Sequence, residues 1–178
     1  MTDADTSTAT DALPGQVFPE QYSALLDAKA AQLKTEFSAH YHGPLDVFAS
    51  PPSHFRMRAE FRVWHAGDRS FFAMFDSSAP RDPVEVAQFP MGSITINRLM
   101  TTLQSAITDT PELRYRLFQA EFMTTLAGDA LVTLVYHRKL DDTWEIAART
   151  LSRQLGIQLI GRSRKQKRVL DQDYVTET

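Results

Sequence analysis

Residues 54–65 alternate between apolar and polar side chains at every position. The apolar positions are Phe55, Met57, Ala59, Phe61 and Val63, and the positions between them are Arg56, Arg58, Glu60, Arg62 and Trp64. Successive side chains of a β-strand point to opposite faces. The pattern therefore predicts a strand with one apolar face and one arginine-rich face.

The arginine-rich face has two interpretations. Three guanidinium groups and an indole suit phosphates and stacked bases, because guanidinium is planar, always charged and weakly hydrated. Alternation of this kind is also the default for a half-buried antiparallel sheet whose outer face is solvated. The pattern alone leaves both interpretations open.

Further apolar runs separated by turns predict the rest of a sheet. Residues 71–75 follow a tight turn and form the return strand of a first hairpin, and residues 84–89 form a third strand. Residues 117–126 and 130–137 form a second hairpin around a turn at 127–129, and residues 157–161 form a last strand.

Apolar residues at helical spacing predict three helices. The first opens at Pro19 and carries Tyr22, Leu26, Leu33 and Phe37 on one stripe, and the second spans residues 93–108. The third begins at a capping box of Asp142 and Glu145 and ends at Gly156. We expect an α+β fold, with a largely antiparallel sheet of two hairpins plus the last strand and the helices on one face.

Composition narrows the class of protein. The chain has 178 residues, 43% of them hydrophobic, which suits one globular domain behind a disordered, acidic and threonine-rich tail at 1–17. The absence of cysteine excludes disulfides, thiolate metal sites and a cysteine nucleophile in this chain. With no apolar run that could cross a bilayer and no secretory signal, we predict a cytoplasmic protein without a membrane partner.

The net charge of −3 conceals a basic region. Residues 1–20 hold four acidic residues and no basic one, which leaves 18 acids against 19 bases in the remainder. The basic residues gather at Arg138 and Lys139 and in a cluster of Arg162, Arg164, Lys165, Lys167 and Arg168. A local patch, rather than the net charge, governs phosphate binding.

Motifs for catalysis are weak. The seven glycines are scattered, and no glycine-rich nucleotide turn occurs. His54, His65 and Glu60 could form an acid–base group, but the histidines flank a strand without metal-ligand spacing. We therefore assign no catalytic and no metal-binding residue. On pattern alone His137 is a structural histidine at a strand end, and Phe118 alternates with Ala120 and Phe122 as a core residue.

Four segments in order resemble the N-terminal half of the tRNA (uracil-5-)-methyltransferase family, which makes 5-methyluridine in the T loop of tRNA. The segments are residues 53–65, 117–119, 136–142 and 159–174. The resemblance implies a T-arm recognition part, followed in family members by a Rossmann-like domain that binds S-adenosylmethionine and carries a cysteine nucleophile. It also implies that the target base is turned out of its stack.

The resemblance assigns roles to three side chains. Phe118 matches the aromatic that inserts among T-loop bases, and Arg62 and His137 match positions that contact RNA. For Phe118 this requires a distorted strand, because regular alternation would bury it. Together with the basic patches, these residues give the predicted RNA-binding set: Arg56, Arg58, Arg62, Phe118, His137, Arg138, Lys139, Arg164, Lys165 and Lys167.

The resemblance also sets the expected organisation. We expect an RNA-recognition domain at 18–174, the start of a linker at 175–178, and a missing methyltransferase domain as the partner in cis. S-adenosylmethionine would serve the full-length enzyme, and no cofactor or metal is expected on this chain, which would bind the tRNA T arm without methylating it. The alternatives are a stand-alone RNA-binding module and a small acid–base enzyme using His54, His65 and Glu60.

Overall fold

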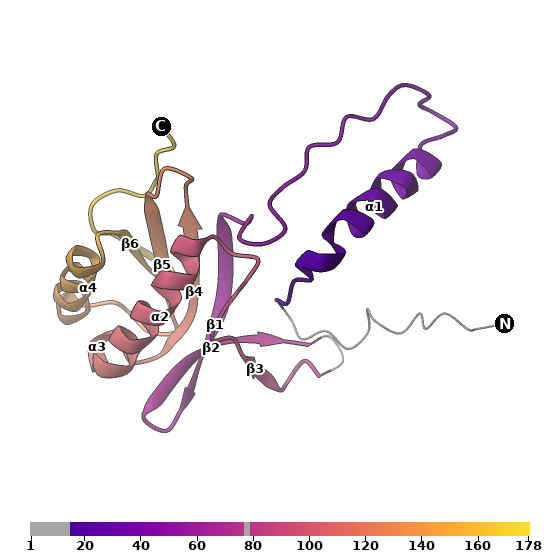
Figure 1. The fold of residues 1–178 in the computed structure, drawn as a ribbon. Helices are drawn as coiled ribbons and strands as arrows, with labels where there is room; N and C mark the ends of the chain where they lie inside the picture. The colour runs from indigo at the N-terminus through magenta and orange to yellow at the C-terminus, as the bar shows by residue number, and fades with distance from the viewer. Residues whose placement is uncertain (1–14, 77–78) are drawn as a thin grey trace.

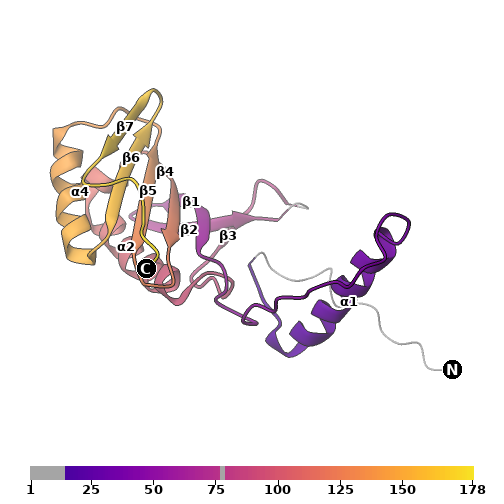
Figure 2. The same ribbon diagram turned by 90° about the horizontal axis from the view of Figure 1, so that it is seen from above.

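The computed structural model describes residues 15–76 and 79–178, so most of the predicted tail, at 1–14, lies outside the described residues. A seven-stranded sheet has the order β3-β2-β1-β4-β5-β6-β7 (Figures 1 and 2). The strands are β1 (Arg58–Ala66), β2 (Arg69–Phe75), β3 (Pro83–Glu85), β4 (Leu117–Thr124), β5 (Ala130–Tyr136), β6 (Gln158–Ser163) and β7 (Gln166–Val169).

Helices α2 (Ile94–Asp109), α3 (Pro111–Arg114) and α4 (Asp142–Leu155) cover one face of this sheet (Figure 2). Their apolar stripes meet the apolar side of the strands in one core. Ile96, Leu103 and Trp144 from the helices and Ala120 and Leu134 from the strands are fully excluded from solvent. The predicted α+β class is therefore confirmed, and the short helix α3 is an addition to it.

Both predicted hairpins are present, β1 with β2 and β4 with β5. The last predicted strand, β6, lies parallel to β5, because α4 carries the chain back to the starting edge before β6 begins. A final strand, β7, was not predicted. Its sequence Gln-Lys-Arg-Val has only one apolar residue, and a turn at Lys165, with a positive φ of 63°, folds it back onto β6.

The arginine-rich strand is shorter than predicted. Alternating burial holds from Arg58 to Trp64, but the segment before Arg58 leaves the strand. There His54 has a positive φ of 56° and Phe55, expected to be buried, is 37% exposed. The backbone N–H groups of His54 and Arg56 donate instead to the carbonyls of Pro90 and Met91, which pins this segment beside the start of α2.

The first predicted helix forms, but its predicted apolar stripe packs on nothing in the sheet. Helix α1 (Tyr22–Glu36), preceded by the 3-10 turn η1 (Pro19–Gln21), contains no buried residue and stands apart from the sheet (Figures 1 and 2). Apolar residues occupy all sides of α1, so the helix has almost no amphipathic preference. No helix in the described residues is both long and apolar enough to span a membrane.

The N-cap of α4 is Asp141, one residue before the predicted Asp142. The Asp141 carboxylate accepts the Trp144 backbone N–H at 2.9 Å and the Thr143 hydroxyl at 2.7 Å. The bond from Trp144, followed by that from Thr143, lowers the pKa of Asp141. The predicted end of the helix is confirmed, since Gly156 has the left-handed conformation with a φ of 64°.

We expect Asp141→Ala to lower the urea midpoint at pH 7. Because the folded-state pKa of Asp141 is depressed, its stabilisation is present above the unfolded pKa of about 4 and is lost as the pH falls through the folded value. The difference between variant and wild type should therefore shrink in acid. Asp142→Ala is the control, since that exposed carboxylate bonds to Arg168 and caps no N–H group; equal effects of the two variants at every pH would contradict the capping role.

Gly161 lets α4 approach the sheet. A Cβ atom on Gly161 would lie 2.2 Å from Cη2 of Trp144 and 2.6 Å from Cδ1 of Leu140. Both neighbours are fully buried, so neither can move aside cheaply. The absence of a side chain at 161 therefore lets the indole of Trp144 pack directly against β6.

Gly161→Ala should destabilise the fold by about 1–3 kcal/mol or more through overpacking, as measured by urea denaturation. Trp144→Phe removes the indole atoms nearest the new methyl group. The cost of Gly161→Ala should therefore be smaller in a Trp144→Phe background. An undiminished cost there would show that backbone conformation, and not the indole, excludes a side chain at 161.

Candidate nucleic-acid interface

The sheet face opposite α2, α3 and α4, called here the open face, carries Arg58, Glu60, Arg62 and Trp64 of β1. Strand register extends this face into a row that crosses five strands. Arg62 pairs with Gln119, Gln119 with Val135, Val135 with Arg162, and Arg162 with Lys167. At about 4.8 Å per strand, Arg62 and Arg162 are anchored roughly 14 Å apart. The predicted strand and the predicted basic cluster therefore share one surface.

A β-bulge brings Phe118 onto the open face. The register of β4 against β5 shifts between Leu117 and Gln119, which leaves Phe118 as the extra residue. Leu117 turns into the core and is 2% exposed, while Phe118 is only partly buried. Arg116, immediately before the bulge, has a positive φ of 56°. The core position suggested for Phe118 by alternation is thus wrong, and the required strand distortion is present.

Phe118 lies between two other planar groups. The guanidinium carbon of Arg62 is 3.3 Å from the Phe118 ring centroid, and the His137 ring centroid is 4.0 Å away with an interplanar angle of 31°. The His137 backbone N–H donates to the Arg116 carbonyl at 3.0 Å, which ties the end of β5 to the bulge. We call Arg62, Phe118 and His137 the planar stack.

The stack leaves Arg62 charged. Desolvation lowers the pKa of Arg62. The ordinary pKa of arginine lies so far above neutrality that the guanidinium keeps its proton at pH 7 despite this shift. A cation over an aromatic face is attracted by about 0.5–1 kcal/mol at an exposed site. The stack is therefore a cationic, preordered platform.

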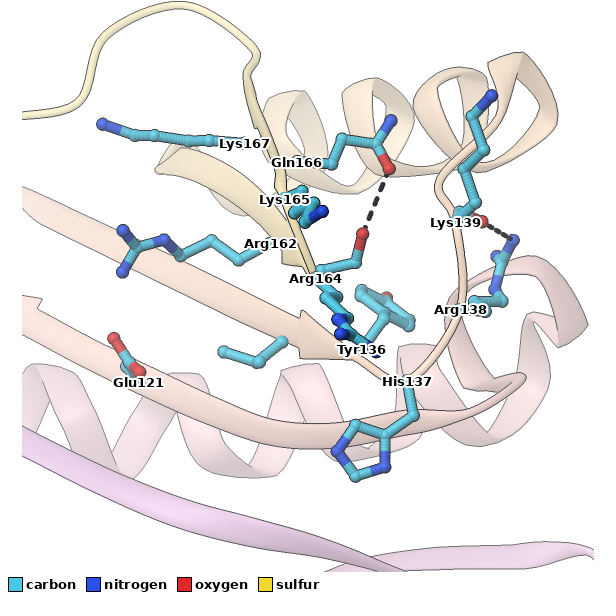
Figure 3. Close-up of a pocket in the computed structure, with 12 residues that line it drawn as sticks. Glu121, Tyr136, His137, Arg138, Lys139, Arg162, Arg164, Lys165, Gln166 and Lys167 are labelled. Atoms are coloured by element: carbon cyan, nitrogen blue, oxygen red, sulfur yellow. Dashed lines mark hydrogen bonds between the residues drawn. The ribbon is translucent and has the colours of Figure 1, made fainter.

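A basic groove of about 1180 Å³ adjoins the stack (Figure 3). Its cationic lining residues are Arg138, Lys139, Arg162, Arg164, Lys165 and Lys167. Arg162 and Lys167 lie side by side across the β6–β7 hairpin, with Glu121 on the opposite wall. Like charges placed opposite each other destabilise a sheet, which favours an anionic ligand for this groove.

The cations of the groove differ in their availability. Within the described part of the chain, Lys139, Arg162, Arg164 and Lys165 form no ion pair or side-chain hydrogen bond, whereas Lys167 pairs with Asp173 at 2.7 Å. Arg138 is used by the fold, because its guanidinium donates to the carbonyls of Tyr115, Glu112 and Lys139. Four cations of the groove are thus free to meet a phosphate.

A second concavity, of about 450 Å³, lies on the other side of the stack and is called here the aromatic pocket. It is lined by Arg62, Val63, Trp64, His65, Arg116, Leu117, Phe118 and His137. His137 borders both concavities. The stack therefore separates a basic surface from an aromatic one.

The alternative acid–base group does not assemble. His54 Nδ1 bonds to the Gly92 carbonyl at 2.8 Å. His65 Nε2 bonds to the Leu117 carbonyl at 2.9 Å, and its Nδ1 bonds to the hydroxyl of Ser70. Both rings thus tie strands and loops together. Within residues 15–76 and 79–178, no group of His, Asp and Glu side chains is placed to hold a metal ion.

Residues 21–178 match the family described as tRNA (Uracil-5-)-methyltransferase. The chain belongs to this family. The matched residues run from the start of α1 through the β6–β7 hairpin to the C-terminal segment. They include the planar stack and every residue that lines the groove and the aromatic pocket. The resemblance found in the sequence is therefore confirmed.

Curated relatives of the family are similar over nearly the whole chain. A tRNA/tmRNA (uracil-C(5))-methyltransferase of Chromohalobacter salexigens is 49% identical over 166 residues, which are 90% of this chain and 44% of that protein. Proteins of the same name from Marinomonas sp. and Dechloromonas aromatica are 45% and 47% identical and cover 93% and 89% of this chain. The chain spans less than half the length of each relative.

The structure of this family member divides the ten predicted RNA-binding residues into three groups. Arg62, Phe118 and His137 come together in the planar stack. The groove collects the next group, namely Arg138, Lys139, Arg164, Lys165 and Lys167. Arg56 and Arg58 remain apart from both, since Arg58 lies four residues, about 13 Å, along β1 from Arg62 and Arg56 precedes the strand.

The predicted set omitted three residues that the structure places at the interface: Arg162, Arg116 and Trp64. Arg162 was noted in the basic cluster, and its pairing with Val135 and Lys167 sets it on the open face. The position of Arg116 depends on the adjacent bulge, which no sequence pattern predicted. Arg168 of the same cluster turns the other way and pairs with Glu145 of α4 at 2.7 Å.

The planar stack predicts an NMR signature. Because the ring of Phe118 lies over His137, the His137 ring protons should be shifted upfield by the aromatic ring current. Phe118→Ala should return them toward random-coil positions. Phe48→Ala, which removes a 91% exposed ring outside the interface, should leave them unchanged. Unshifted His137 protons in the wild type would exclude the stack in solution.

Proposed function

We propose that this chain is the T-arm recognition part of an S-adenosylmethionine-dependent tRNA (uracil-5-)-methyltransferase, which forms 5-methyluridine in the T loop. One observation carries the proposal: a cationic planar stack stands exposed between an aromatic pocket and a groove that holds four unpaired basic side chains. Family membership and the tRNA named for the relatives support the same ligand.

The two sides of the stack suit the two kinds of RNA contact. Basic side chains that bind phosphates set position and affinity without reading sequence. Aromatic and guanidinium planes accept unstacked bases, and single-stranded loops are where proteins read RNA. Arg162, Arg164 and Lys165 would hold the RNA backbone. Phe118 would exchange its contacts with Arg62 and His137 for RNA bases and so replace the stacking lost when the target base is turned out.

Methyl transfer itself lies beyond the residues of this chain. S-adenosylmethionine supplies the methyl group in this chemistry, and its binding normally uses a glycine-rich turn between a strand and a helix. The sequence contains no such turn and no cysteine to act as a nucleophile, so its residues do not fit the cofactor. We propose that this chain binds RNA and that the catalytic groups belong to the remaining length seen in the relatives.

Binding to a T-arm hairpin RNA tests the proposal by fluorescence anisotropy. We expect Arg62→Ala and Phe118→Ala each to weaken binding by about 1–3 kcal/mol, since each removes a base or phosphate contact. Arg162→Ala should weaken binding and also reduce the dependence of log K on log salt by about 0.7–0.9, the contribution of one phosphate.

The matched control is Arg153→Ala, which removes the same charge from the exposed surface of α4 on the opposite side of the sheet. It should leave affinity and salt dependence close to those of the wild type. Equal affinities for Arg62→Ala, Phe118→Ala and Arg153→Ala would reject the open face as the RNA site.

A further inference from the structure

Trp64 is an exposed aromatic side chain in a sheet whose other large rings are mostly buried. Its side chain lies on the open face and is 40% exposed, whereas Phe61, Phe72 and Phe122 are almost completely excluded from solvent. Phe75 contacts it edge-on, with ring centroids 6.2 Å apart and an interplanar angle of 64°. The indole is therefore supported from the side and open to a ligand.

The pocket beside Trp64 has rigid walls. His65 is held at both ring nitrogens, by the Leu117 carbonyl at 2.9 Å and by the Ser70 hydroxyl at 2.8 Å. Ser70 in turn accepts a hydrogen bond from Arg114 Nε at 3.0 Å. The guanidinium of Arg116, on the bulge side, forms no ion pair in the described part of the chain. It makes one long hydrogen bond of 3.5 Å to the His137 carbonyl and lies 5.8 Å from the ring centroid of Tyr115.

Phe118 cannot provide the same binding surface as Trp64. Both faces of the Phe118 ring are already covered, one by Arg62 at 3.3 Å and the other by His137 at 4.0 Å. In the described residues, no cation and no ring besides Phe75 contacts the indole of Trp64. An RNA base could therefore stack on Trp64 without displacing a protein group, whereas stacking on Phe118 would require one to move.

We propose that the aromatic pocket is a nucleobase site, in which one unpaired base of the bound RNA stacks on Trp64 while Arg116 meets its polar edge or its phosphate. A cavity of about 450 Å³ with an indole wall and a guanidinium that forms no ion pair in the described residues suits a flat, polar ligand that carries a phosphate. The site rests on the proposed function and adds a second base contact to it, separate from the planar stack.

Tryptophan fluorescence tests this site directly, because the chain has two tryptophans and the other, Trp144, is fully buried. Titration of the 178-residue chain with a T-arm hairpin RNA should quench the emission of Trp64, since a stacked base quenches indole. Trp64→Phe should abolish the quench and keep most of the affinity. Trp64→Ala should weaken binding about 5- to 140-fold, the range for one lost stacked base.

Salt dependence and single-base deletions separate stacking from charge. Trp64→Ala should leave the salt dependence of binding unchanged, because the indole carries no charge, whereas Arg116→Ala should reduce it if Arg116 meets a phosphate. A series of hairpins, each abasic at one loop nucleotide, should contain one that no longer quenches Trp64. With that RNA, Trp64→Ala should cause no further loss of affinity.

The outcomes distinguish this inference from the proposed function. Phe48→Ala is the matched control, as it removes an exposed ring that lies beside α1 and lines neither the groove nor the aromatic pocket, and it should change nothing. If Arg62→Ala weakens binding while Trp64→Ala behaves like Phe48→Ala and no quench occurs, the nucleobase site is wrong and the recognition function stands. If the wild type binds no hairpin RNA, both fall. Circular dichroism of each variant, with Trp64→Phe as the conservative change, excludes misfolding as the cause.

Discussion

One extra residue in β4 controls the interface. Without the bulge at Phe118, strict alternation would send this ring into the core beside Ala120 and Phe122 and leave Leu117 exposed. The shift buries Leu117 and turns Phe118 outward between Arg62 and His137. A bulge disrupts a ladder locally and re-aims a side chain, which is why such irregularities are common beside functional sites. Phe118 belongs to both the planar stack and the aromatic pocket, and the groove adjoins them at His137.

The interface also depends on the way α4 returns the chain to the edge of the sheet beside β5. Trp144 fills the space over Gly161, so α4 lies close to the sheet and β6 joins β5 in parallel. This connection brings Arg162 into the same row as Arg62, although the two are a hundred residues apart in the sequence. The β6–β7 hairpin then carries Arg164 and Lys165 into the groove that His137 also lines (Figure 3).

The two faces of the sheet separate basic residues that are neighbours in the sequence. Arg149 of α4 and Arg168 of β7 both pair with Glu145 in the helix layer, and these bonds hold the pKa of Glu145 below its ordinary value. Alternation along β7 leaves Lys167 on the open face, beside Arg162. A chain of net charge −3 therefore presents a cationic groove on one side. Bulk charge says little about such a surface, because phosphate binding depends on local potential.

The sequence by itself determined the strongly periodic parts: the arginine-rich strand, both hairpins, α2 and α4, and the α+β class, because burial of apolar side chains imposes a period of two or 3.6 on each of them. It also placed Arg62, Phe118 and His137 at the site, but only through resemblance to a family. Tertiary structure decided the rest. The bulge, the polar strand β7 and the separation of α1 from the core depend on contacts between distant segments, and no local pattern encodes which of several exposed cations a sheet will bring together.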